Sequence, residues 1–202
     1  MANQLALLQA ARLKGRLSPE LAAASTGIDV DAASSALHEL REAGYVKGEP
    51  SVRLTPEGRE QLATLVAEER ARLDREALAP LYEEFDHHNT ELKQLISDWQ
   101  LKDGNPNDHG DTAYDQAVID RLAALDAKFQ QLVVRIVEVA PRLGNYPVRF
   151  GQALDRIRSG DTSYVARPIT DSYHTVWFEF HEELIGLLGL SREEEAAAGR
   201  AL

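Results

Sequence analysis

Histidine, carboxylate and tryptophan side chains recur at helical spacings in the last two thirds of the chain. His88 and Trp99 fall on one stripe of an expected helix. Asp171, His174 and His181 share a face of another, because residues three or four positions apart stack on a helix. Facing helices that carry imidazole and carboxylate groups can build a metal or anion pocket in a bundle core. The candidate ligand-binding residues are His88, Trp99, Asp171, His174, Trp177 and His181.

The same histidines also fit a structural role. Histidines flanked by aromatic residues are commonly half-buried and hydrogen-bonded to a neighbouring carboxylate, hydroxyl or carbonyl. The Glu-x-x-His motif of di-iron bundles is absent, and Asp171-x-x-His174 is only a shortened analogue of it. We therefore predict either packed histidines or a small-molecule pocket, with no metal site and no cofactor.

Positive charge is concentrated in one stretch of this otherwise acidic part. Its arginines could receive the carboxylate or phosphate of a ligand. They could equally pair with Asp155, Asp161 and the surplus glutamates, each pair contributing little to stability. The arginines are Arg142, Arg149, Arg156, Arg158 and Arg167.

No catalytic motif accompanies these residues. The chain has no cysteine, which excludes disulfides, thiolate metal ligands and cysteine nucleophiles. It also lacks a glycine-rich phosphate loop, a serine nucleophile elbow and a zincin motif. We predict that the protein is not an enzyme; an enzyme built on the bundle histidines and Asp171 is a competing hypothesis.

Composition and charge limit the possible partners. The chain has 202 residues, 44% hydrophobic and 27% charged, as in globular proteins, and is long enough for two domains. Its net charge is −11. Residues 1–70 hold 8 Lys/Arg against 10 Asp/Glu, a net charge of −2, which leaves −9 for the rest. Because DNA-binding surfaces are usually basic, the C-terminal part is not expected to contact DNA.

The sequence shows no signal for a membrane. The segment from Met1 to Leu5 lacks the basic and apolar regions of a signal peptide. No segment approaches the roughly 20 apolar residues that span a bilayer. We therefore expect a cytoplasmic protein with no membrane partner.

The first third of the chain predicts three short helices. Ser18 as N-cap and Pro19 at the first helical position begin the second helix. Asp29 or Asp31 caps the third. The expected helices are 5–14, 19–25 and 30–43, and the expected buried stripe of the third is Val30, Ala33, Ala36, Leu37 and Leu40.

A small β hairpin and a long helix follow. Residues 45–47 and 51–54 are short alternating runs separated by Gly48-Glu49-Pro50, which predicts two strands and a turn. Thr55 as N-cap and Pro56 then begin a helix. Its expected apolar side is Leu62, Leu65, Val66, Ala67 and Leu73.

These elements resemble the winged helix-turn-helix domain of MarR-type regulators. In that family a leucine, a threonine, a small pair and a glycine follow the wing, and the run here is Leu54-Thr55-Pro56-Glu57-Gly58-Arg59. The resemblance covers residues 4–75 and implies a homodimeric transcription regulator whose third helix enters a groove of double-stranded DNA. The side chains available for bases or phosphates are Ser34, Ser35, His38, Arg41, Lys47, Arg53, Lys14 and Arg16.

The charge of the third helix supports a different hypothesis. Asp31, Glu39 and Glu42 surround a single Arg41, whereas DNA-reading helices use Arg, Lys, Asn and Gln. Winged helices also serve as protein-docking modules, and loosely similar ones accompany phosphotransferases. The alternative to a DNA-binding regulator is thus an adaptor that does not bind DNA and partners a metabolic phosphotransferase. A second alternative is a helical bundle that binds a small molecule or a metal.

From about Leu78 onward the pattern predicts helices joined by polar loops, without strands. The expected helices are 80–101, 114–139, 148–158, 169 or 171 to 188, and a last one at 193–200, with a loop at 102–112. The predicted fold is mainly α with a small β wing. A winged helix, residues 1–75, precedes a helical bundle, residues 76–202, that provides dimerisation, effector binding or both.

Overall fold

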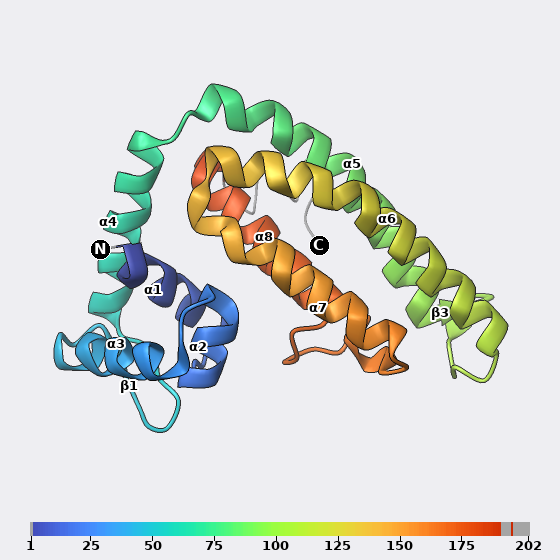
Figure 1. Ribbon diagram of the computed structural model, residues 1–202, viewed down its shortest axis with the longest axis horizontal. Helices are drawn as coiled ribbons and strands as arrows, with labels where there is room; N and C mark the ends of the chain where they lie inside the picture. The colour runs from blue at the N-terminus through green and yellow to red at the C-terminus, as the bar shows by residue number, and fades with distance from the viewer. Residues whose placement is uncertain (1, 191–194, 196–202) are drawn as a thin grey trace. The chain divides into compact units, whose positions relative to one another are not determined.

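The protein is mainly α-helical with two small antiparallel sheets, which confirms the predicted fold class (Figure 1). The computed structural model describes residues 2–190 and residue 195. The chain forms two compact units, Met1–Leu73 and Asp74–Leu202. Within the described residues, none of the helices combines the length and the apolar character needed to span a bilayer.

The first unit begins with three helices, of which the second and third have N-cap side chains. They are α1 (Ala2–Lys14), α2 (Pro19–Thr26) and α3 (Val30–Glu42). The Ser18 hydroxyl accepts from the Leu21 amide at 3.3 Å, as its N-cap position predicts. The Asp29 carboxylate accepts from the amides of Asp31 and Ala32, so Asp29 and not Asp31 caps α3.

The hairpin is shorter than the sequence predicts and gains a third chain segment. Strands β1 (Val46–Lys47) and β2 (Arg53–Leu54) pair antiparallel, with Lys47 opposite Arg53. Leu17, in the turn after α1, forms an antiparallel bridge with Val52 through two 2.9 Å backbone hydrogen bonds. The segment between α1 and α2 therefore extends this small sheet.

The core of the first unit follows the predicted stripes with two corrections. Ala33, Leu37 and Leu40 of α3 are buried. Val30 is 42% exposed, because it is the first residue of α3 and lies beyond the part of the stripe that packs on the other helices. Ala67, expected on the apolar side of the long helix, is exposed.

The helix α4 (Pro56–Arg72) is joined to the hairpin by Thr55. The Thr55 hydroxyl donates to the Gly44 carbonyl at 2.7 Å and accepts from the Gly58 amide at 3.0 Å. A Cβ on Gly58 would lie 1.9 Å from the carbonyl oxygen of Tyr45, so only glycine fits there. This explains why the run from Leu54 contains a glycine at that place.

The second unit is a helical bundle with a second small hairpin. Its helices are α5 (Arg75–Gln100), α6 (Thr112–Val139), α7 (Tyr146–Arg158) and α8 (Tyr173–Leu188), with 3-10 turns at Pro141–Asn145 and Thr162–Tyr164. The long helices α5 and α6 lie side by side, and α8 packs against α7 and α5 (Figure 1). The fully buried rings of Trp177 and Phe129 contact each other in the core, with centroids 4.0 Å apart and planes tilted by 33°.

Three predictions for this unit were wrong. The first helix begins at Arg75 and not at Pro80, because Asp74 caps it and Pro80 lies inside it. Strands β3 (Leu101–Lys102) and β4 (Asn105–Pro106) form a hairpin where only a loop was expected. The last long helix begins after Ser172, whose hydroxyl accepts from the Thr175 amide, so Asp171 is outside it.

One predicted element lies outside the described residues. The sequence predicts a final helix at 193–200, and of these residues the structure describes only Glu195. Its side chain is buried against Tyr82 of α5.

The contact between Gly58 and Tyr45 is directly testable. We expect Gly58→Ala to destabilise the protein by about 2 to 3 kcal/mol, because the added methyl group overlaps backbone that cannot move freely. Gly151→Ala is the matched control; its Cβ meets nothing within 4 Å, and it gains up to about 1 kcal/mol of helix propensity. Urea unfolding followed by circular dichroism measures both, and equal stability of the two variants would contradict the account.

Candidate functional site

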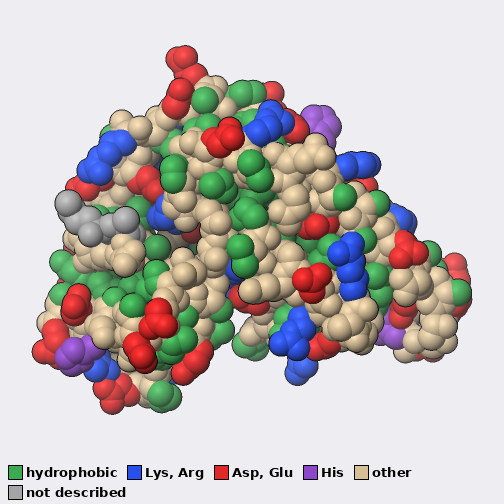
Figure 2. Space-filling model, viewed as in Figure 1, with side chains coloured by type: hydrophobic (Ala, Val, Ile, Leu, Met, Phe, Trp, Pro, Cys, Tyr) green, Lys and Arg blue, Asp and Glu red, His purple; other side chains and the backbone are tan. Residues whose placement is uncertain are grey.

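The exposed face of α3 combines neutral donors with acids. Ser34, Ser35 and His38 are all exposed, as expected for a helix that contacts a partner. Asp31, Glu39 and Glu42 are exposed on the same helix. Figure 2 shows acidic side chains, among others, on the face where Figure 1 places α3. The surface of α3 alone is therefore unfavourable for a polyanion.

Arg41, the only cation of α3, is held by its neighbours within the first unit. Its guanidinium pairs with the carboxylate of Glu49 in the hairpin loop and donates to Nδ1 of His38 at 3.0 Å. The predicted contacts of Arg41 and His38 with DNA therefore require this small network to open. The sequence gives no sign of it, because Arg41 and Glu49 are in different elements.

A depression of about 660 Å³ lies between α3 and the hairpin loop. Ser34, His38 and Arg41 line one side of it, and Glu49, Pro50 and Val52 line the other. Three of the predicted DNA-binding residues thus share one surface with the tip of the hairpin.

A row of three cations crosses the small sheet. Lys47 is directly opposite Arg53 in the hairpin. On the other side of β2, Leu17 is the antiparallel bridge partner of Val52. Arg16, the residue before Leu17, is therefore in register with Arg53, the residue after Val52. The neighbouring apolar residues Val46, Val52, Leu54 and Leu17 are buried, and the three cations are exposed. We call Arg16, Arg53 and Lys47 the cation row.

The positive charges of the cation row are not balanced by acidic side chains among the described residues. Among the described residues, none of its three side chains forms an ion pair. Like charges directly opposite each other destabilise a sheet, so an anion placed over the row would relieve repulsion. Lys14, the remaining predicted cation, is half-buried and has a partner within the structure. The row is therefore a group of exposed positive charges without an acidic partner among the described residues.

In the second unit, two of the predicted ligand-binding residues are packing residues. The Trp177 indole N–H is fully buried and donates to the Asn89 carbonyl oxygen at 3.0 Å. His181 is 4% exposed, and its Nε2 lies 2.9 Å from the Tyr82 hydroxyl. The Tyr82 hydroxyl in turn donates to Glu195. Both side chains are thus satisfied by the fold itself.

Buried ion pairs account for Asp171 and two of the arginines. The Arg149 guanidinium, 3% exposed, donates to Glu179 at 2.6 Å and to Asp171 at 3.2 Å. Arg142 binds Glu183 through two hydrogen bonds of 2.8 Å. Burial lowers the pKa of the Arg149 guanidinium, but attraction to Glu179 and Asp171 contributes to a larger opposite effect, so the pKa is raised above its usual value. Two of the five arginines are therefore ion-paired as the alternative predicted, but their partners are buried glutamates and Asp171 and not Asp155 or Asp161.

His88 and His174 are half-buried and separate from these pairs. Desolvation by burial lowers the pKa of His88 below 6.5, and Glu84 and Glu91 act in the opposite direction. Burial alone lowers the pKa of His174. Among the described residues, no group of three or more His, Cys, Asp or Glu side chains is placed to hold a metal ion.

Trp99 has a polar neighbour that the sequence interpretation missed. The ring of His109, from the loop before α6, lies with its centroid 4.5 Å from that of Trp99. Nδ1 of His109 donates to Asp115 at 2.9 Å. The only local signal was an Asp-His-Gly turn, which predicts a loop without showing which side chain it approaches.

Comparison of the chain with known protein families, with curated proteins and with solved structures finds no significant match. Interpretation of the surfaces therefore depends on their own geometry and charge.

The half-buried histidines predict a loss of stability in mild acid. Because the native pKa of His174 lies below 6.5, the unfolded chain binds more protons below that pH. Stability is therefore complete at a pH above the unfolded value of about 6.5 and is lost as the pH falls through it toward the lower native pKa. His174→Gln should flatten this part of the profile of melting temperature against pH; an unchanged slope would contradict the burial of the neutral ring.

Proposed function

We propose that the first unit is a winged helix-turn-helix module that binds double-stranded DNA. The observation that carries the proposal is the cation row, three unpaired and exposed cations on the sheet next to α3. Such cations neutralise backbone phosphates, which supply most of the affinity and position the module. Lys47 and Arg53 belong to the hairpin, the wing of this fold, and Arg16 belongs to the turn before α2.

The exposed residues of α3 are suited to a secondary role in this complex. Ser34, Ser35 and His38 can donate to phosphates or to base edges without adding charge. The acids of α3 oppose close approach, so we expect modest affinity that depends strongly on salt. In this complex the cations of the wing supply most of the affinity, and the residues of α3 make a smaller contribution.

The second unit completes a regulator in this proposal. It pairs two copies of the chain and holds an effector, and the protein catalyses no reaction. In a two-fold dimer the two α3 helices would reach grooves about 34 Å apart, one turn of DNA. The support for a regulatory unit is indirect: it is a separate compact bundle whose net charge keeps it off the DNA.

A second candidate function is docking to a basic protein. The observation that favours it is the acidic surface of α3, with Arg41 already neutralised by Glu49. A partner rich in lysine and arginine would match this surface, as charge complementarity directs protein association. The two candidates use different residues of the same unit and are separable by substitution.

The cation row predicts the salt dependence of DNA binding. With three phosphate contacts in each unit, the slope of log K against log salt is about −2.7 per unit bound. Each of Arg16→Gln, Lys47→Gln and Arg53→Gln should reduce the slope by about 0.9. Arg59→Gln, an exposed arginine on α4, is the control and should leave it unchanged. Fluorescence anisotropy with a labelled duplex measures the slope; absence of salt-dependent binding would rule out the proposal.

Substitution of Glu49 should change the affinity for DNA and the affinity for a basic protein in opposite directions. Glu49→Gln releases Arg41 and removes one negative charge from the depression. DNA binding should strengthen about threefold to tenfold, whereas docking of a basic peptide should weaken. Anisotropy measurements with a duplex and with an oligolysine peptide compare both; a DNA affinity that falls would contradict contact of DNA with this surface.

A further inference from the structure

The chain between the end of α7 and α8 is basic, although the unit that contains it is acidic. Residues 156–170 hold three arginines and one acid, a net charge of +2, whereas residues 71–202 together carry −9. The three arginines, Arg156, Arg158 and Arg167, are all exposed. In Figure 1 the chain after α7 forms a loop that projects beside the helices. Positive charge is thus displayed at one place on an otherwise negative unit.

These three arginines differ from the others of the unit in having no acidic partner. Within the described part of the chain, none of the three forms an ion pair. The nearest acids in the sequence are Asp155 and Asp161, and Asp161 accepts instead from the Ser163 hydroxyl at 2.6 Å. The other arginines that the structure describes in this unit all have a partner: Arg75, Arg121, Arg135, Arg142 and Arg149. Acids are in surplus, so a shortage of them does not explain the difference.

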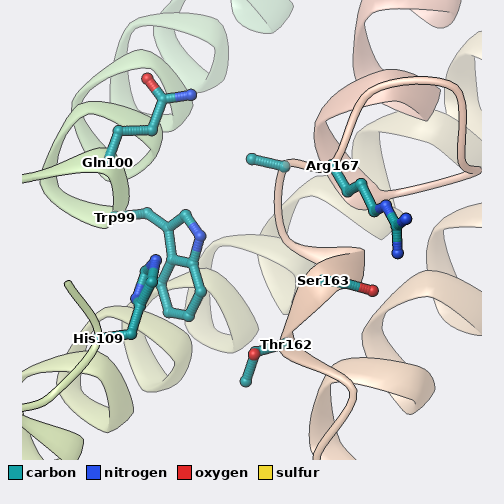
Figure 3. A pocket seen from close by; sticks show the side chains of 7 residues that line it. Trp99, Gln100, His109, Thr162, Ser163 and Arg167 are labelled. Carbon is teal, nitrogen blue, oxygen red and sulfur yellow. The ribbon is translucent and has the colours of Figure 1, made fainter. Parts of the chain in front are cut away.

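Arg156 and Arg167 lie on either side of Tyr164. The guanidinium carbon of Arg156 is 5.7 Å from the centre of the Tyr164 ring. The Arg167 amide donates to the Ser163 carbonyl at 3.0 Å, so the chain between them makes one helical turn. Residues three apart on such a turn are neighbours, which places Arg167 next to Tyr164. Figure 3 shows the Arg167 side chain directed away from Trp99, on the side of Ser163.

The same loop displays an apolar side chain. Ile169 is 101% exposed and has a φ of 68°, a left-handed conformation that is unfavourable for a β-branched residue. The loop is fixed at its base, because the Asp171 carboxylate pairs with the buried Arg149 at 3.2 Å. Ile169 is therefore held in solvent by an anchored loop, two residues from the unpaired Arg167.

We propose that Arg156, Arg167 and Ile169 form a docking surface for an acidic protein segment that carries an apolar residue. Carboxylates of the segment pair with the two planar guanidinium groups, which suit bidentate recognition. The apolar residue removes the Ile169 side chain from water. The proposal concerns the second unit alone and does not depend on DNA binding by the first.

The charge of the remaining unit favours a short protein segment over an extended polyanion. Charges more than about 8 Å apart are largely screened at physiological salt, so a short segment interacts mainly with the local arginines. A DNA duplex or an anionic membrane extends far beyond this distance and would also meet the surplus acids of the unit. A duplex, in addition, offers its charged backbone and not an apolar cover for Ile169.

Isoleucine methyl NMR locates the surface directly. The chain has seven isoleucines, which can be labelled with ¹³C at their δ1 methyl groups, and Ile169→Val identifies the resonance of Ile169. Titration of the full chain with the peptide Glu-Glu-Leu-Leu-Glu-Glu should shift this resonance and leave those of the buried Ile119 and Ile136 in place. No shift of Ile169 at millimolar peptide would overturn the proposal. An equal shift with a mixed-sequence duplex or with phosphatidylserine vesicles would overturn the choice of partner.

Matched peptides and variants separate the charged and apolar contributions, with fluorescence anisotropy of the labelled peptide as the readout. Glu-Glu-Ser-Ser-Glu-Glu and Lys-Lys-Leu-Leu-Lys-Lys should each bind at least about threefold more weakly. Arg156→Gln and Arg167→Gln should each weaken the acidic peptide by about twofold to fivefold. Ile169→Gly should weaken it by about threefold to tenfold. Because glycine adopts positive φ freely, this variant should keep or raise the melting temperature, so its weaker binding does not come from unfolding.

The control variant is Arg158→Gln, which makes the same change at an exposed arginine of the same helix. Arg158 is two residues from Arg156 and therefore points to the other side of α7. It should bind the acidic peptide like the unaltered protein. Equal weakening by Arg158→Gln and Arg167→Gln would show a general charge effect and overturn the assignment, as would equal binding of the leucine and serine peptides.

Discussion

The arrangement of the first unit depends on the hydrogen bonds of Thr55. Its hydroxyl joins the end of α3, at Gly44, to the first turn of α4, at Gly58, and its amide donates to the Tyr45 carbonyl at 3.0 Å. These bonds fix where the hairpin leaves α3. They therefore also fix the surface that α3 shares with the hairpin loop and the place of the cation row. The close approach of Gly58 to Tyr45 makes this junction intolerant of any side chain.

The second unit is organised by a different constraint, the burial of charge on α8. Glu179 and Glu183 are buried on this helix and are compensated by Arg149 and Arg142 of the neighbouring segments. Loss of one member of such a pair costs about 3 to 5 kcal/mol, because the other is left buried without a partner. Charged residues that could have bound a ligand, such as Asp171 and Arg149, instead form ion pairs within the bundle.

Local signals predicted much of the fold. Ser18 and Thr55 placed two helix caps correctly, because a cap depends on neighbouring residues alone. The alternation in 45–54 placed the hairpin, although its strands are shorter than predicted. Contacts between distant segments were not predictable: neither the bridge from Leu17 to Val52 nor the pairing of Arg41 with Glu49 leaves a periodic pattern. In the bundle, helical spacing placed Asp171 on a helix face, but α8 begins only after the Ser172 N-cap, so Asp171 lies outside it. The sequence therefore identified the cations of the first unit but could not show which of them are already paired.

The central claim is that the first unit contacts DNA through the cation row next to α3. The most direct measurement is the change in backbone amide NMR shifts when a duplex of mixed sequence is added to the full chain at low salt. The account predicts shifts concentrated at Arg16, Lys47 and Arg53, with smaller ones at the exposed face of α3, and none in α5 to α8. Shifts confined to the second unit, or no shifts at any protein-to-DNA ratio, would contradict it.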